Sequence, residues 1–286
     1  MKKTAIMIDG GFFMKRLNYY LRKHFPDTEL NGAQIKDVIW SLVRHHLEVR
    51  HGNHSFQRPC ELFRIYYYDC PPLELQLKRP IAIRKNIGGE EREVFEDFNT
   101  KKHPPYMLIK DLHSELRKNR KTALRLGELR PNSDGHWGIN PKVLKDLLQG
   151  KKTWSELTND DFVHTFRQKE VDIKLGMDIT ILSHEKLVDS IVLIAGDSDF
   201  VPAAKHARIK GVDFILDALH ASIPESLNEH IDGLQNSDLI MSLEQVCKKA
   251  PVNLSEGYIA KKKERREKRE RGGNKHRTNR KSNKSR

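Results

Sequence analysis

The sequence predicts an α/β fold in which a parallel sheet carries helices on both of its faces. Short apolar runs alternate along the chain with stretches of helical periodicity, as strands and crossover helices do in such folds. The runs at 5–8 and 190–195 are continuously apolar, which is typical of parallel strands buried on both faces. The 286 residues are enough for one or two domains with a substantial core.

The first part of the chain supplies two strands and two helices. Gly10 and Gly11 give the backbone freedom for a turn directly after the first apolar run. The second strand is rich in aromatic and β-branched residues, and Asp69, Cys70 and two prolines end it. The expected elements are a strand over 5–8, helices over Phe12–Leu21 and Gln34–Val49, and a strand over Leu62–Tyr68.

Residues 71–150 have the least regular pattern, because they are polar, rich in Lys and Arg, and interrupted by Pro and Gly. We expect this region to be an elaboration inserted into the domain and lying over the sheet. Within it and after it, the expected elements are a helix over Tyr106–Lys118 and strands over Thr122–Arg130 and Phe162–Gln168.

Regular alternation returns at Val171. Gly211 is the expected end of one helix, since a glycine just past the last turn is the usual C-terminal signal. The expected elements are a helix over Asp172–Lys186, a strand over 190–195, a helix over Phe200–Lys210, a strand over Val212–Leu216, and helices over Leu227–Gly233 and Asp238–Lys249. We assign residues 1–250 to one domain.

The positive charge is concentrated at the end of the chain. The net charge is +13, and residues 261–286 contain 14 Lys/Arg and three Glu, a net of +11. The other 260 residues carry 38 Lys/Arg and 36 Asp/Glu, a net of +2. We therefore predict a disordered basic tail over 251–286, which either binds polyanions through their phosphates or only solubilises the protein.

Several classes of protein are disfavoured. Cys60, Cys70 and Cys247 form no zinc-like pairs, and this fits a reducing cytoplasm. The chain has no run of 18 apolar residues, so we expect no membrane span, and Asp9 follows the first apolar run too closely for a secretory signal. A GxxxxGK[ST] loop is absent, which argues against a P-loop NTPase, and no Ser-His-Asp arrangement stands out.

Two apolar strands end in acid. Asp9 follows the run at 5–8, and Asp197 follows the run at 190–195 with Gly196 between. Because the carboxyl ends of parallel strands meet at one edge, we expect these side chains to gather there. Asp199 either joins them or caps the next helix. Gathered carboxylates repel one another, and a divalent cation removes that conflict; oxygen ligands suit Mg²⁺ or Mn²⁺.

Two further acids lie on a predicted helix. Asp172 and Asp178 are six residues apart, which is roughly 120° around an α-helix. They either flank a shared metal site, or one of them reaches it and the other is an ordinary exposed aspartate. A metal held in such a cluster lowers the pKa of bound water and stabilises the oxygens of a phosphodiester displacement.

Three segments carry a resemblance to a known family. They are Ile6–Phe13, Lys169–Asp172 continuing to Gly176–Asp178, and Ile194–Phe200. In order and spacing, the chain resembles NYN-domain proteins of the LabA/DUF88 group in the PIN-like nuclease superfamily, over about residues 4–240. Two departures stand out. Glu170 replaces the glycine of the family's Lys-Gly-x-Asp pattern, and Gly11 and Phe12 stand where many relatives have Asn.

The resemblance implies a Rossmann-like (PIN-like) sheet and a metal-dependent endoribonuclease using Mg²⁺ or Mn²⁺. It implies Asp9, Asp172, Asp197 and Asp199 as metal-binding or water-activating acids, with Asp178 as a fifth ligand. The alternative is a non-catalytic RNA-binding or regulatory module on the same fold; a DNA nuclease or small phosphatase is the weakest alternative. A homo-oligomer is compatible with either function. The basic residues expected to contact RNA are Arg117, Lys118, Arg120, Lys121, Lys169, Lys174, Lys261, Lys262, Lys263, Arg265 and Arg266, with Arg125 beside them.

Overall fold

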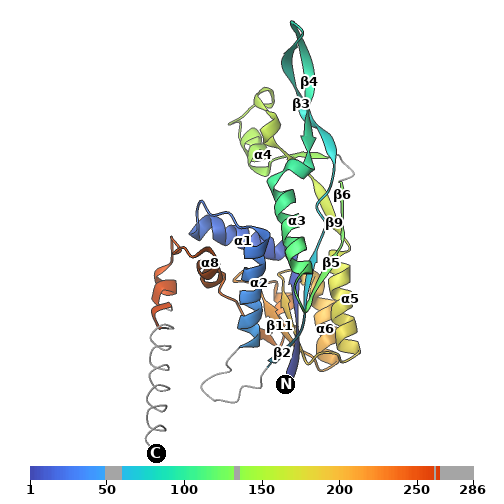
Figure 1. The fold of residues 1–286 in the computed structure, drawn as a ribbon, viewed down its shortest axis with the longest axis vertical. Helices are drawn as coiled ribbons and strands as arrows, with labels where there is room; N and C mark the ends of the chain where they lie inside the picture. Colours follow the sequence, from blue (N-terminus) through green and yellow to red (C-terminus); the bar gives the residue numbers. More distant parts are fainter. Residues whose placement is uncertain (49–59, 132–135, 261, 265–286) are drawn as a thin grey trace, which may run out of the picture.

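The computed structural model describes residues 1–48, 60–131, 136–260 and 262–264 (Figure 1). Its centre is a six-stranded sheet in the order β12-β11-β10-β1-β2-β5, in which every pairing is parallel. The predicted fold class is therefore confirmed. The strands are β1 (Lys2–Asp9), β2 (Cys60–Asp69), β5 (Thr122–Leu126), β10 (Ser190–Ile194), β11 (Asp213–Asp217) and β12 (Gly233–Leu234).

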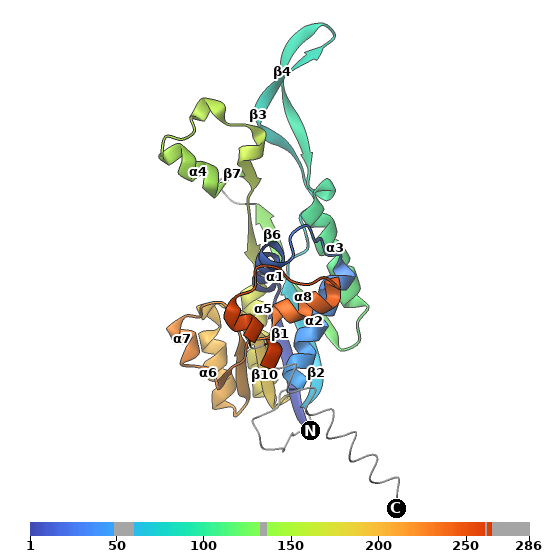
Figure 2. The same ribbon diagram turned by 90° about the vertical axis from the view of Figure 1, so that its left-hand side faces the viewer.

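Helices cover both faces of the sheet, as the sequence predicts (Figures 1 and 2). One face is covered by α1 (Gly10–His24), α2 (Gly32–Leu47), α3 (Pro104–Arg117) and α8 (Leu239–Cys247), and the other by α5 (Val171–His184), α6 (Val201–Ile209) and α7 (Glu225–Asn228). Alternate residues of β1 enter opposite cores: Ile6 and Ile8 pack under α1 and α2, and Ala5 and Met7 pack under α5 and α6. No helix in the described part of the chain is long and apolar enough to cross a bilayer.

The turn from β1 into α1 depends on a close approach of two backbones. A Cβ atom on Gly10 would lie 2.6 Å from the carbonyl oxygen of Tyr68 on the neighbouring strand. Asp9 closes the turn as the N-cap of α1, because its Oδ1 accepts the N–H of Phe12 at 3.1 Å. The same residues that form this turn therefore fix Asp9 at the edge of the sheet.

Only part of the middle of the chain lies over the sheet: α3 covers one face and β5 joins the sheet, but the segment before α3 does not lie over it. Strands β3 (Gln76–Ile87) and β4 (Glu90–Asn99) form an antiparallel hairpin that projects beyond the carboxyl edge of the sheet (Figures 1 and 2). Charged residues are spread along both of its strands, which gives it little apolar surface to pack on the sheet. Beside it lie two ribbons and a helix: β6 (Glu128–Pro131) with β9 (Phe166–Lys169), β7 (Trp137–Ile139) with β8 (Phe162–His164), and α4 (Pro141–Leu148).

Three predicted elements differ from the structure. The strand over 122–130 is two strands in different sheets, broken at Gly127, where a Cβ atom would lie 2.4 Å from the carbonyl oxygen of Lys169. The strand over 162–168 is likewise β8 and β9. The helix over 227–233 is wrong, because α7 ends at Asn228 and Gly233 begins the edge strand β12. Helix α6 is preceded by a 3-10 turn over Ser198–Phe200.

The expected start of the tail at residue 251 also differs from the structure. Residues 251–260 pack on the domain: the N–H of Val252 donates to the carbonyl of His24, and the hydroxyl of Tyr258 donates to Asp238. The domain therefore extends past residue 250. Lys261 and residues 265–286 lie outside the described residues, and disorder there stays a prediction.

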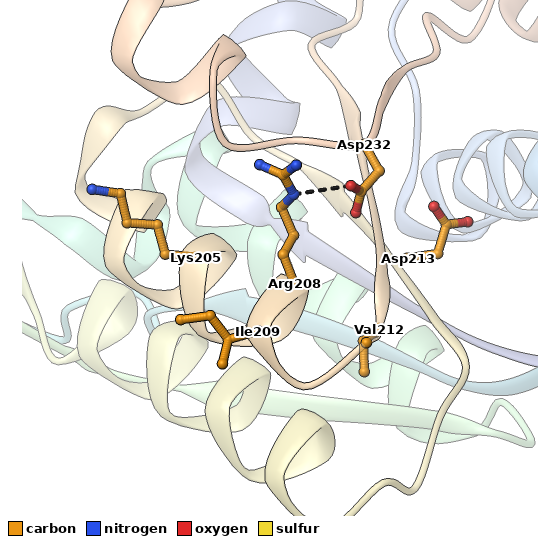
Figure 3. A pocket seen from close by; sticks show the side chains of 7 residues that line it. Lys205, Arg208, Ile209, Val212, Asp213 and Asp232 are labelled. Atoms are coloured by element: carbon orange, nitrogen blue, oxygen red, sulfur yellow. Dashed lines mark hydrogen bonds and ion pairs between the residues drawn. The ribbon is translucent and has the colours of Figure 1, made fainter.

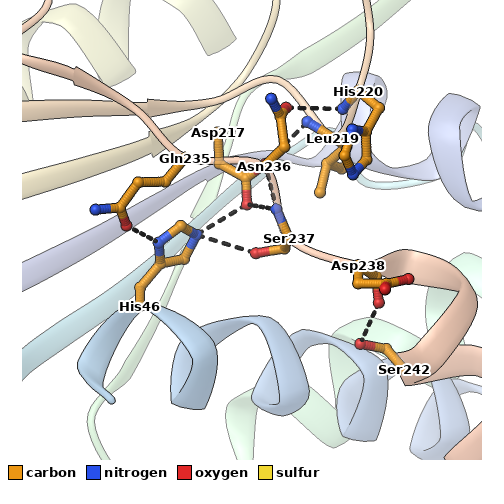
Figure 4. A network of polar contacts seen from close by, with 9 residues as sticks. All are labelled: His46, Asp217, Leu219, His220, Gln235, Asn236, Ser237, Asp238 and Ser242. Atoms are coloured by element: carbon orange, nitrogen blue, oxygen red, sulfur yellow. Dashed lines mark hydrogen bonds and ion pairs between the residues drawn. The ribbon is translucent and has the colours of Figure 1, made fainter. Parts of the chain in front are cut away.

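Two buried His–Asp pairs fasten helices of one face to the ends of strands. His46 of α2 contacts Asp217 of β11, with 2.8 Å between Nε2 and Oδ2, and His113 of α3 contacts Asp69 of β2 at 2.9 Å. Figure 4 shows the first pair with Ser237, whose backbone N–H also donates to Asp217. Burial alone would raise the pKa of Asp217, but the contacts with His46 and Ser237 and the N–H of Leu219 hold it below the ordinary value.

The His46–Asp217 pair yields a test of stability. Replacing His46 by Ala is expected to lower the free energy of unfolding by about 3 kcal/mol at neutral pH, because it leaves a buried carboxylate without its partner. A carboxyl with a lowered pKa stabilises the fold above its ordinary pKa and loses that contribution as the pH falls through the folded value. The effect of the substitution should therefore shrink in acid. Urea titrations at several pH values, with His45→Ala at the exposed neighbour as control, measure it; equal effects of both variants would contradict it.

The start of α5 yields a second test. Glu170 caps this helix in the left-handed conformation, with φ of 71°, which explains why glycine suits the position. Glu170→Gly should be more stable than Glu170→Ala by about 1 kcal/mol, because both variants lose the exposed ion pair with Lys174 and only glycine relieves the backbone. Thermal melts of the two variants measure the difference. Equal midpoints would show that the backbone at residue 170 is not strained.

Candidate active site

All four central strands deliver an aspartate to the carboxyl edge of the sheet. Asp9, Asp69 and Asp217 end β1, β2 and β11, and Asp197 follows β10 by three residues. The acids of the two flanking strands are those paired with histidine. The acids of the two innermost strands, Asp9 and Asp197, take part in no ion pair among the residues that the structure describes. The edge therefore leaves its central carboxylates uncompensated.

Asp9 is half-buried at the base of this edge. Burial raises the pKa of its carboxyl, the N–H groups of Phe12 and Gly11 oppose that rise, and the nearby Asp172 adds to it. Lys15, one turn further along α1, lowers the pKa again. The charge of Asp172 therefore repels the Asp9 carboxylate, and the charge of Lys15 attracts it.

Asp172 links the two halves of the cluster. It lies in the first turn of α5, on the surface. Partial burial of the Asp172 carboxyl raises its pKa, and the negative charges of Asp197 and Asp199 raise that pKa further. Asp197 and Asp199 are exposed, and Asp197 Oδ1 accepts the N–H of Asp199 at 3.1 Å. The four acids that sequence analysis selected therefore act on one another electrostatically across an open edge.

The fit of a metal to this edge depends on donor chemistry and spacing. The four carboxylates are hard oxygen donors without paired cations, which suits a divalent ion such as Mg²⁺ or Mn²⁺. Among the described residues, however, no group of three or more His, Cys, Asp or Glu side chains is close enough to hold a metal ion. The donor chemistry fits the ion, and a bound ion would have to draw the carboxylates closer together.

Asp178, the expected fifth ligand, is engaged elsewhere. Arg125 of β5 grips it with two hydrogen bonds of 2.9 and 3.0 Å, and the hydroxyl of Tyr68 donates to it at 2.8 Å. Only 14% of its side chain is exposed. These contacts fasten α5 to β2 and β5, so we leave Asp178 out of the proposed metal site.

The expected basic contacts are spread over the molecule. Arg117, Lys118, Arg120 and Lys121 lie where β5 begins, away from the carboxyl edge. Lys118 pairs with Glu115 at 2.7 Å, and Lys121 pairs with Glu61 at 3.3 Å. The parallel direction of β5 places its start at the opposite side of the sheet from the acids, and the contact of this group with RNA stays a prediction.

Of the remaining basic residues, Lys169 lies at the end of β9, three residues before Asp172. Lys174 is taken up by Glu170 at 2.9 Å and by the carbonyl of Leu126 at 2.8 Å. Lys262 pairs with Glu244 at 2.6 Å, and Lys263 is exposed. Lys261, Arg265 and Arg266 lie outside the described residues.

Sequence reasoning missed three residues beside the acids. Lys15 acts on Asp9, as described above. The Oε1 atom of Gln168 and the Oδ1 atom of Asp9 both lie 3.4 Å from the point where a Gly11 Cβ would stand, so an exposed amide adjoins the carboxylate. The ring of Phe12 covers Gly196, where a Cβ would lie 2.6 Å from it. The signal in the sequence that could have indicated Gln168 and Phe12 was glycine at positions 11 and 196, since side chains of other residues approach the backbone closely at both positions.

A cavity of about 660 Å³ lies at the other end of the sheet (Figure 3). It is bounded by the end of α6 and the start of β11, including Ile209 and Asp213, and Arg208 pairs with Asp232 at 2.9 Å inside it. It contains none of the four acids, so the cavity and the candidate site are separate.

Comparison with solved structures gives only distant likenesses. A protein of unknown function from Vibrio parahaemolyticus is 13% identical, with 83% of this chain and 93% of that chain covered and a TM-score of 0.40. A sirtuin from a study of sirtuin substrate affinity is 10% identical, with 86% and 93% covered and a TM-score of 0.31. Scores this low support no conclusion about function. The search of curated proteins gave no match.

The family comparison is more specific. Residues 138–237 match the model of the NYN domain. This stretch contains Asp172, Asp197 and Asp199, and the structure adds Asp9 to them from β1, outside the matched residues. Membership of the LabA/DUF88 group stays a prediction. Residues 138–237 of this chain are therefore similar to the NYN domain, and NYN domains belong to the PIN-like nuclease superfamily.

Proposed function

We propose that this protein is a metal-dependent endoribonuclease that hydrolyses RNA phosphodiester bonds at the carboxyl edge of its sheet. The observation that supports this most directly is the gathering of Asp9, Asp172, Asp197 and Asp199 at one edge, where burial and neighbouring acids raise the pKa of Asp9 and Asp172. Acids gathered without paired cations are typical of sites that receive a positive charge. The NYN domain match supports a nuclease-type activity, and NYN domains generally act on RNA.

In this proposal the four acids hold one or two Mg²⁺ or Mn²⁺ ions. The ion supplies a water of lowered pKa and stabilises charge on the phosphate oxygens. Lys15 and Lys169 attract the phosphate backbone toward the edge, and the Gln168 amide beside Asp9 is placed to donate to a phosphate or ribose oxygen. The basic residues beyond 260 raise the local concentration of RNA through salt-sensitive phosphate contacts.

The shape of the site favours cleavage within a chain. Asp172, Asp197 and Asp199 are exposed along an edge, so an RNA strand can lie across them without inserting an end. We place this activity in the cytoplasm, because Cys60, Cys70 and Cys247 are thiols and form no disulfide.

A non-catalytic RNA-binding role on the same fold is the second candidate. One observation favours it: within the described residues, the acids do not stand as a group of three close enough for a metal ion. This role predicts RNA binding that persists without the acids and depends on the basic residues beyond 260. A chain ending at residue 264 would then lose both affinity and the salt dependence of binding.

Activity distinguishes the two candidates. Asp197→Asn is expected to reduce cleavage of labelled single-stranded RNA in Mg²⁺ or Mn²⁺ by about 100-fold or more, because it removes a charged oxygen donor. Asp189→Asn is the matched control, since Asp189 precedes the same strand at its opposite end and accepts the N–H of Lys3, which Asn can also do. RNA binding without cleavage by the wild type would leave the second candidate, and equal cleavage by all three proteins would contradict a catalytic role of Asp197.

Stability tests the metal site without any assay of activity. Asp172→Asn is expected to raise the thermal midpoint at neutral pH without metal, because it removes a charge that Asp197 and Asp199 repel. The pKa of the Asp172 carboxyl is higher in the folded protein than its ordinary value of 3.8. Such a carboxyl does not lower the stability of the fold at a pH below that ordinary value, and it lowers the stability as the pH rises through the folded value. The gain should therefore vanish in acid.

The same melts include the metal. Mg²⁺ or Mn²⁺ should raise the midpoint of the wild type and of Asp189→Asn more than that of Asp172→Asn, because an ion that binds the folded state stabilises it. A variant that is less stable than the wild type at neutral pH would contradict the repulsion between these acids. A metal effect of the same size in all three proteins would place the ion elsewhere.

A further inference from the structure

The outer face of α5 is apolar and open to solvent. Ile173, Met177 and Ile181 follow one another at the spacing of one helical turn, and they are 67%, 56% and 48% exposed. The inner face is also apolar, with Leu175 and Ile179 fully buried. A helix with apolar residues on two opposite faces normally has both faces covered, so the outer stripe indicates an interface that the single chain leaves open.

Gly176 lies within the same face. A glycine in the interior of a helix costs about 1 kcal/mol relative to alanine, so it usually serves a packing purpose. No atom of the described chain lies within 4 Å of the position of its Cβ, so nothing there requires the missing side chain. The gap beside Met177 lets the backbone of another helix approach closely.

The segments outside the described residues do not account for a cover. Residues 265–286 contain no apolar side chain, and residues 132–135 are Asn-Ser-Asp-Gly. Residues 49–59 join α2 to β2, and α2 covers the opposite face of the sheet from α5.

We propose that the occupant is a second copy of this chain, with the two α5 helices packed antiparallel about a twofold axis at Met177. Such an axis places Met177 against its own copy and Ile173 against Ile181, so that one stripe covers the other. It also brings unlike charges together. Residues equally distant from Met177 become opposite, which pairs Glu170 with His184 and Lys169 with Glu185.

The size of the stripe sets the expected affinity. Three half-exposed aliphatic side chains offer on the order of 300 Å² of apolar surface, at the scale of patches that mark interaction sites. A standard interface buries roughly 800 Å² on each partner, so polar residues around the stripe must supply the remainder. We therefore expect dimerisation in the micromolar range. Because Asp172 begins α5, the two acidic edges would lie at opposite ends of the helix pair.

The mass in solution tests the proposal on the full-length protein. Light scattering after gel filtration should give twice the 33.3 kDa chain mass at high micromolar concentration and fall toward the chain mass on dilution. Met177→Glu should reduce association at least tenfold, because it places like charges at the axis. Ile209→Glu is the control: it is 81% exposed on α6, outside the stripe, and should associate like the wild type. Thermal melts confirm that both variants fold.

Cross-linking tests the register. Met177→Cys should form a disulfide-linked dimer under mild oxidation, since only a pairing centred there brings residue 177 to its own copy, and Ile209→Cys should not. A wild type that stays monomeric, a dimer that Met177→Glu leaves intact, or equal cross-linking of both cysteine variants would overturn the proposal. These measurements do not involve RNA cleavage, so their outcome is independent of the proposed nuclease activity.

Discussion

The fold and the candidate site both depend on which aspartates at the ends of the parallel strands are paired with histidine and which are not. Four strands run in one direction and each brings an acid to the same edge, where burial opposes the ionisation of Asp9 and the nearby Asp172 adds to that effect. At Asp69 and Asp217 a histidine from a covering helix satisfies the carboxylate and fastens that helix to the sheet. At the two innermost strands the acids keep their charge unmatched. The same residue type thus stabilises the flanks of the sheet and leaves a reactive centre.

This division explains why sequence analysis found the acids but could not rank them all. Asp9 and Asp197 were predictable because an apolar run ending in acid fixes the edge on which the side chain lies. Asp178 was not, because its role depends on Arg125, which is distant in sequence and reaches it only when β5 pairs with β2. Asp217 ends a predicted strand just as Asp9 does. Its pairing with His46 follows from how α2 packs, which periodicity does not specify.

The region between the two halves of the sheet was predicted least well. Residues 76–87 carry only basic charges and residues 90–99 mostly acidic ones, without a dominant apolar face, so the pattern indicates neither a core strand nor an amphipathic helix. The basic group near residue 120 shows the same limitation in another form. Shared charge predicted that this group contacts RNA, but only strand direction shows that Lys121 and Asp9 lie at opposite ends of the sheet.

The β3–β4 hairpin stands above the edge that carries the acids, and it lies on the path of any polymer that approaches from beyond the strand ends (Figure 1). Such an obstacle restricts the direction of approach more severely for a rigid rod than for a pliable thread. A double helix is stiff over the dimensions of this domain, whereas an unpaired strand can bend around the hairpin and expose its backbone. If the edge binds RNA as we propose, the hairpin would favour an unpaired strand over a double helix through its flexibility, before any side chain contacts a base.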